Sequence, residues 1–187
     1  MNVIIFGPPG AGKGTQAGNI VNKFNLYQVS TGDLLRNEVR NQTEIGKDIE
    51  NIISKGDFAT DEIVNELIKN VISDPKKKNK LIFDGYPRSL SQAKNLNLLL
   101  DHFKQTIDFI FFLNVQKETI IERIEKRKIL EKRSDDNLST ILKRYDTYMD
   151  RTKPVLDFYS KNSNFYEIDG SGKIEEISSK IEQILTV

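Results

Sequence analysis

Short apolar runs alternate with segments of helical periodicity along the whole chain. Four runs without regular polar alternation predict buried strands, at residues 3–6, 81–83, 109–113 and 165–168. A weaker strand is predicted at 27–29. Helix-length segments follow these strands, at 13–24, 32–42, 60–73, 90–100, 116–127, 137–160 and 173–185. This alternation is typical of an α/β fold in which a parallel sheet carries helices on both faces.

Length and charge exclude several classes of protein. The chain has 187 residues, which fits one domain with a substantial core, and 28 Lys and Arg against 27 Asp and Glu. A general nucleic-acid or membrane-surface binder would usually carry a basic excess. The first strand starts without a signal peptide, and no apolar run approaches the roughly 20 residues of a membrane span. We therefore expect a cytoplasmic protein with no nucleic-acid or membrane partner.

The scarcity of reactive side chains narrows the chemistry further. The chain has no Cys and a single His, so it has no disulfide, thiol nucleophile, cysteine-rich zinc site or His-pair metal cluster. Any catalysis must therefore use carboxylates, hydroxyls, Lys, Arg and backbone amides.

A glycine-rich loop follows the first strand and precedes a helix. It runs Gly7-Pro8-Pro9-Gly10-Ala11-Gly12-Lys13-Gly14-Thr15. Glycines let successive backbone N–H groups converge on one anion, and the helix that follows adds its positive end. Lys13 supplies a charge for the outer phosphates. Because Gly14 stands where the general pattern has Ser or Thr, a hydroxyl ligand to magnesium is a weaker prediction than the phosphate cradle.

Two further segments end strands of the predicted sheet. Residues 29–36 read VSTGDLLR, and residues 84–88 read DGYPR with Gln92 shortly after. The carboxyl ends of parallel strands line one crevice, so both segments should open towards the phosphate loop. The guanidinium group of an arginine can donate two parallel hydrogen bonds to two oxygens of one phosphate. Five arginines are candidates for such contacts: Arg36, Arg88, Arg127, Arg133 and Arg144.

Together these motifs resemble the adenylate kinase family over nearly the whole chain. The phosphate loop, STGDLLR at 30–36, GDFATDE at 56–62, DGYPR with Gln92, and RSDD at 133–136 with Arg144 occur in the family's order. The resemblance implies a P-loop nucleoside monophosphate kinase fold with a five-stranded parallel sheet. It further implies one kinase domain, with core residues 1–29, 60–126 and 137–187, an AMP-binding insertion at 30–59 and a short lid at 127–136.

The resemblance also assigns roles to residues. ATP binding falls to Gly10, Ala11, Gly12, Lys13, Gly14, Thr15, Arg127 and Gly172. AMP binding falls to Thr31, Arg36, Asp57, Phe58, Ala59, Gly85, Tyr86, Pro87, Arg88, Gln92, Arg133 and Arg144. The groups that follow the migrating charge would be Lys13, Arg88, Arg127, Arg133 and Arg144. Asp84 would hold magnesium through bound water.

The implied reaction is reversible magnesium-dependent transfer of a phosphoryl group from ATP to AMP, giving two ADP, by a monomer that maintains adenine nucleotide balance. A pyrimidine monophosphate kinase acting on UMP or CMP is the nearest alternative, although Thr31 and Gln92 favour AMP. A GTPase switch would need an Asn-Lys-x-Asp segment, which the chain lacks.

Several polar and aromatic residues have a structural alternative. We expect Asp33 to lie in a first helical turn, and Asp135 or Asp136 to cap a helix or hinge the lid. Arg123, four residues before Arg127, is expected to pair with acidic neighbours and is left out of the site. The remaining expectations are a solvated loop at 76–80, a surface His102, and core positions for Tyr145, Tyr148 and Phe158.

Overall fold

The fold is built on a five-stranded parallel sheet, as predicted. The structure is a computed structural model that describes all residues except 55–56, 58, 132–137 and 187. The strands pair in the order β2-β3-β1-β4-β5. Their bounds are β1 Val3–Phe6, β2 Tyr27–Ser30, β3 Leu81–Asp84, β4 Phe109–Asn114 and β5 Phe165–Asp169. The predicted strands are therefore confirmed to within a residue at their ends.

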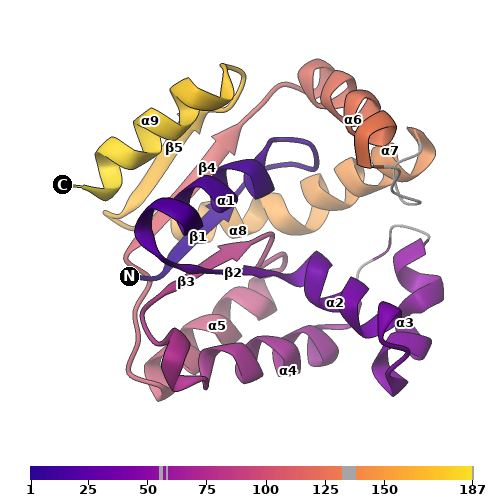
Figure 1. Ribbon diagram of the computed structural model, residues 1–187, viewed down its shortest axis with the longest axis vertical. Helices are drawn as coiled ribbons and strands as arrows, with labels where there is room; N and C mark the ends of the chain where they lie inside the picture. The colour runs from indigo at the N-terminus through magenta and orange to yellow at the C-terminus, as the bar shows by residue number, and fades with distance from the viewer. Residues whose placement is uncertain (55–56, 58, 132–137, 187) are drawn as a thin grey trace.

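Helices cover both faces of the sheet because the residues of the central strand point alternately to the two sides. Ile4 and Phe6 of β1 pack with α4 (Asp61–Ile72), α5 (Leu90–His102) and α8 (Lys153–Tyr159). Val3 and Ile5 pack with α1 (Lys13–Phe24), α6 (Lys117–Glu131) and α9 (Ile174–Leu185). Figure 1 shows these layers, with both chain termini at the same side of the molecule.

The two edge strands are less buried than the central strands. Along β5 only Ile168 is buried, and along β2 only Val29. The prediction of a buried strand at 165–168 was therefore wrong for most of its residues. The physical reason is position: β5 pairs only with β4 in the described sheet, so its outer side is left to solvent.

One helix was missed, and two were given wrong bounds. The helix predicted at 32–42 is α2 (Thr31–Arg40), and the unpredicted α3 (Glu44–Ser54) packs against it. Helix α6 continues to Glu131 instead of ending at 127. The segment 137–160 divides into α7 (Leu138–Thr147), a π-helix (Tyr148–Thr152) and α8. Pro154 accounts for this division, because it lacks the N–H that an α-helix needs there.

Most of the structural alternatives hold where they can be examined. The segment 75–77 is a short 3-10 helix (η1), and Lys76, Lys78 and Lys80 are exposed. Asp33 lies in the first turn of α2, and His102 is exposed at the end of α5. Tyr148 is buried, but Phe158 is 36% exposed, so its predicted core position was wrong. Asp135 and Asp136 lie outside the described residues.

In the described part of the chain, the helices are too short or too polar to cross a membrane.

Candidate active site

The phosphate loop joins β1 to α1 and is held in a tight curl. Gly10 has a φ of 82°, and a Cβ at that position would lie 2.8 Å from Cγ1 of Ile124. Glycine is therefore required there both by backbone conformation and by the close approach of α6. The Lys13 ammonium folds back over the loop and donates to the carbonyls of Gly7 at 2.9 Å and Pro8 at 3.0 Å. The loop thus presents one cation above a ring of backbone groups.

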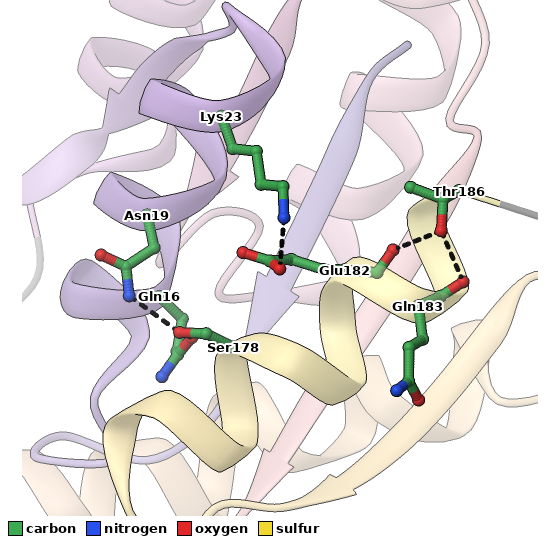
Figure 2. A network of polar contacts seen from close by, with 7 residues as sticks. All are labelled: Gln16, Asn19, Lys23, Ser178, Glu182, Gln183 and Thr186. Atoms are coloured by element: carbon green, nitrogen blue, oxygen red, sulfur yellow. Dashed lines mark hydrogen bonds and ion pairs between the residues drawn. The ribbon is translucent and has the colours of Figure 1, made fainter.

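Helix α1 begins at Lys13 and has no acidic residue in its first turn. Its positive end is therefore not neutralised by its own sequence and favours an anion. Figure 2 shows that the same helix is fastened to α9 by side chains. Asn19 donates to Ser178 at 2.8 Å, Ser178 donates to Gln16 at 2.7 Å, and Lys23 pairs with Glu182 at 2.6 Å. The helix that follows the loop is therefore held in place by polar contacts with α9.

The opposite wall of the site is the turn that follows β3. Arg88 Nε donates to the carbonyl of Gly85 at 2.6 Å, and its backbone N–H donates to Oε1 of Gln92 at 2.7 Å. The Thr31 hydroxyl at the start of α2 donates to the same Gly85 carbonyl at 3.1 Å. Gly85 has a φ of 69°, which folds the turn back on itself. This turn therefore connects the start of α2 with the guanidinium of Arg88.

Three arginines influence one another in this region. Burial, as the largest cause, and the charges of Arg144 and Arg36 together lower the pKa of Arg88 to about 10, while Asp84 opposes the shift. Cations held this close together destabilise one another unless an anion lies between them. Arg36 also pairs with Asp33 at 2.5 Å. The cluster is therefore suited to bind an anion of high charge.

Asp84 ends β3 opposite the start of α1. The Gln28 side-chain amide donates to its Oδ2 at 3.0 Å. A Cβ at Gly14 would lie 3.5 Å from the same oxygen, so glycine leaves the carboxylate accessible beside the helix end. The described residues contain no group of three or more His, Cys, Asp or Glu that could hold a metal by themselves. A single carboxylate does fit a magnesium ion that takes its other ligands from water and phosphate.

These walls enclose one cleft of about 660 Å³, a size typical of sites for small molecules. Helices α2, α6 and α7 contribute residues to its lining. In Figure 1, α2 and α3 extend beyond the sheet on one side and α6 and α7 on the other. The predicted residues that line it are Gly10, Gly12, Lys13, Gly14, Thr15, Arg36, Asp84, Gly85, Arg88, Arg144 and Gly172. The cleft therefore joins a phosphate loop to an arginine cluster.

Comparison with known proteins agrees with this geometry. A family model described as adenylate kinase matches residues 5–164. An adenylate kinase of Pelagibacter ubique is 51% identical, with 100% of both chains covered. An adenylate kinase of Parabacteroides distasonis is 40% identical, over 98% of this chain and 96% of the relative. The chain belongs to the adenylate kinase family.

Membership confirms the resemblance found in the sequence, the fold class and the enzyme class, a phosphotransferase with a phosphate group as acceptor. It supports the adenylate kinase interpretation over the pyrimidine kinase alternative. The roles of single residues in this family member stay predictions.

Some predicted residues of this adenylate kinase family member lie beside the cleft. Pro87 lines a small adjoining pocket, and Ala11 is buried beneath the loop. Ala59 and Tyr86 lie in the core, where burial raises the pKa of Tyr86 to about 12. Any contact of Tyr86 with a ligand would therefore come from its backbone.

Gln92 and Asp57 are engaged with other parts of the protein. The Gln92 amide donates to Oδ1 of Asp61 at 2.7 Å, in addition to accepting from Arg88. Asp57 pairs with Lys143 of α7 at 2.6 Å. Arg127 lies in the part of α6, residues 125–131, of which only the backbone is described, and Phe58 and Arg133 fall outside the described residues.

The sequence interpretation missed Arg123. Its guanidinium donates to the backbone carbonyls of Ala11, Ser171 and Gly172 at 3.3 to 3.5 Å, and it lines the cleft. The expected pairing with acidic neighbours is replaced by contacts with the loop and with the turn after β5. Its place four residues before Arg127, on one helix face, was the signal that could have included it.

Proposed function

We propose that the protein transfers the γ-phosphoryl group of ATP to AMP, reversibly, giving two ADP. The observation that supports this most directly is the single cleft that joins the phosphate loop to the arginine cluster of Arg36, Arg88 and Arg144. A nucleotide hydrolase would need only the loop and a bound water. A second strongly basic wall is what a second phosphorylated substrate requires.

The two walls suggest the placement of the substrates. ATP would lay its phosphates on the loop between Gly10 and Thr15, with its base towards Gly172 and Arg123. AMP would take the side of Thr31, Arg36 and Gly85, with its phosphate at Arg88 and Arg144. Phe58, Arg127 and Arg133 stay predicted contacts of the substrates, on the basis of the family resemblance.

The chemistry needs no protein nucleophile. An oxygen of the AMP phosphate forms a bond to the γ-phosphorus of ATP, and the bond from that phosphorus to the β,γ-bridging oxygen breaks. The moving group is best stabilised by fixed positive charges and N–H donors that are already in position. Lys13, Arg88 and Arg144 border one small pocket at the junction of the two walls, which suits them to this role.

Magnesium would be held next to Asp84. The ion would neutralise phosphate charge when bound, and Asp84 would hold it through its water ligands because the described residues contain no group of three or more His, Cys, Asp or Glu that could hold a metal by themselves. Replacing Asp84 by Asn should raise the magnesium concentration needed for half-maximal activity by about 10- to 100-fold. An unchanged magnesium titration would contradict this assignment.

The domain division stays a prediction of the same kind. We infer an acceptor-side insertion at 30–59 and a short lid at 127–136 that close over the substrates and keep water out. The monomeric state and the cytoplasmic location are likewise predictions.

The test is a coupled assay of ADP formation from magnesium and ATP, with and without an acceptor. We expect activity to depend on AMP and to exceed that with UMP, CMP or GMP. Hydrolysis of ATP that ignores AMP would overturn the proposal. A preference for UMP or CMP would favour the pyrimidine kinase alternative instead.

A further inference from the structure

The π-helix that follows α7 lies against the junction of the two walls. Arg144, Tyr148 and Thr152 are spaced four residues apart, and all three line the small pocket beside the cleft. Pockets next to π-helical turns are often functional. The Thr152 hydroxyl donates to the backbone carbonyl of Arg88 at 3.1 Å, so the π-helix is tied to the acceptor-side turn.

This pocket has room for a polar ligand group. Its volume is about 50 Å³, and a bound water needs only roughly 10–15 Å³ on this scale. Lys13 and Gly7 border it from the phosphate loop, and Gly85 and Arg88 border it from the acceptor side. The pocket is therefore lined by cations on two sides. It lies next to the position at which a phosphoryl group would pass from ATP to AMP.

Tyr148 lines this pocket, and the hydroxyl at the end of its side chain is an unusual group. The side chain is only 7% exposed, yet its hydroxyl has no hydrogen-bond partner in the described structure. Buried hydroxyls are normally bonded, and an unbonded one calls for a reason. The hydroxyl of Tyr159, another buried tyrosine, donates to Asn97 at 3.3 Å. Tyr148 thus differs from a tyrosine that is buried for packing alone.

The hydroxyl proton is not bonded to any other described group of the protein. Burial raises the pKa of Tyr148, and the neighbouring Tyr145 adds to the shift, so the group keeps its proton at any physiological pH. A neutral O–H donor complements a phosphate oxygen whose charge the nearby arginines already balance.

We propose that the Tyr148 hydroxyl is a substrate-binding group that donates a hydrogen bond to a phosphate oxygen of AMP. The assignment rests on the proposed function and deepens it. The acceptor phosphate is favoured over those of ATP because Gly85, Pro87 and Arg88 share the pocket, and because Thr152 ties the π-helix to Arg88.

The experiment compares Tyr148→Phe with the control Tyr159→Phe. We expect Tyr148→Phe to raise the KM and Kd for AMP about tenfold, since the partner is charged, and to leave the KM for ATP within twofold. Tyr159→Phe should leave both KM values unchanged. Kd is measured by calorimetric titration of AMP, without turnover.

A second readout separates binding from structure. Without ligand, Tyr148→Phe should unfold at the same temperature as the unchanged chain or higher, because an unbonded buried hydroxyl is removed. The rise in unfolding temperature on adding AMP should be smaller.

An unchanged Kd for AMP, or a ligand-free variant that unfolds earlier, would overturn this assignment. AMP-dependent activity in the unchanged chain shows that the proposed function stands independently of it.

Discussion

The two walls of the cleft are built in different ways. The donor wall is a loop between a central strand and α1, and α1 is fastened to α9 by the contacts in Figure 2. The acceptor wall consists of the turn after β3 and the first residues of α2, and α3 packs closely on α2 and extends with it beyond the sheet. Thr31 of α2 contacts Gly85 of that turn, and Asp57, which follows α3, pairs with Lys143 of α7. We infer that the donor wall is preformed and that the acceptor wall is the part able to adjust as a unit.

The largest effect is expected where both walls meet. Arg88→Ala should lower kcat by about 10²- to 10³-fold in both directions, because it removes a fixed charge from the transferring group. Arg40→Ala, at the exposed end of α2, is the matched control and should keep near-normal activity. Steady-state rates in both directions provide the measurement. An Arg88→Ala protein with near-normal AMP-dependent ADP formation would remove this residue from the reaction.

The acceptor wall can be disturbed without touching the cleft. Gly46 of α3 lies so close to the backbone of Glu38 in α2 that an added Cβ would fall far inside van der Waals contact. Gly46→Ala should therefore cost about 1–3 kcal/mol in the free energy of unfolding. It should also raise the KM for AMP more than the KM for ATP.

The control for this substitution is Gly18→Ala in α1, where nothing lies within 4 Å of an added Cβ. That change should stabilise the protein by about 0.5–1 kcal/mol, because alanine is the better helix former. Urea unfolding curves measure both effects. If Gly46→Ala raised both KM values equally, the two walls would not be independent.

A change in the donor wall should affect the KM for ATP more than the KM for AMP. Arg123→Ala removes a guanidinium that contacts the phosphate loop and the turn near Gly172. We expect the KM for ATP to rise about tenfold, in line with the loss of a charged hydrogen-bond donor, and the KM for AMP to change less than twofold. Glu122→Ala, exposed on the same helix, is the control. A larger effect on AMP than on ATP would contradict the assignment of Arg123 to the donor wall.

Arg123 also shows where prediction from the sequence ends. The phosphate loop and the strands were predicted because their signals are local: glycine spacing and short apolar runs. Whether Arg123 reaches the loop depends on where α6 crosses it, and Gly10 and Ile124 set that crossing by contact. The unbonded hydroxyl of Tyr148 is likewise a property of packing and has no sequence signature.

Helix α3 is a different kind of omission. Ile45, Ile49 and Ile52 recur at helical spacing, so a signal was present. The segment is otherwise polar and follows α2 after a short turn at Gln42, which has a φ of 53°. The isoleucine spacing indicates a helix but does not show that it packs on α2, which only the close contact at Gly46 reveals.

The smallest effect is expected from breaking the ion pair that connects the acceptor side of the cleft to α7. Lys143 and Asp57 pair at 2.6 Å, with side chains 47% and 45% exposed. Exposed pairs contribute only about 0.2–1 kcal/mol, so Lys143→Glu should change the KM for AMP by about fivefold at most. The double variant Lys143→Glu with Asp57→Lys should restore it, and the difference should shrink in high salt. Breaking the Lys23–Glu182 pair on the donor wall, at the same 2.6 Å, should leave the KM for AMP unchanged. Equal effects of the two pairs would show that the charge lost, and not its place on the acceptor wall, sets the response.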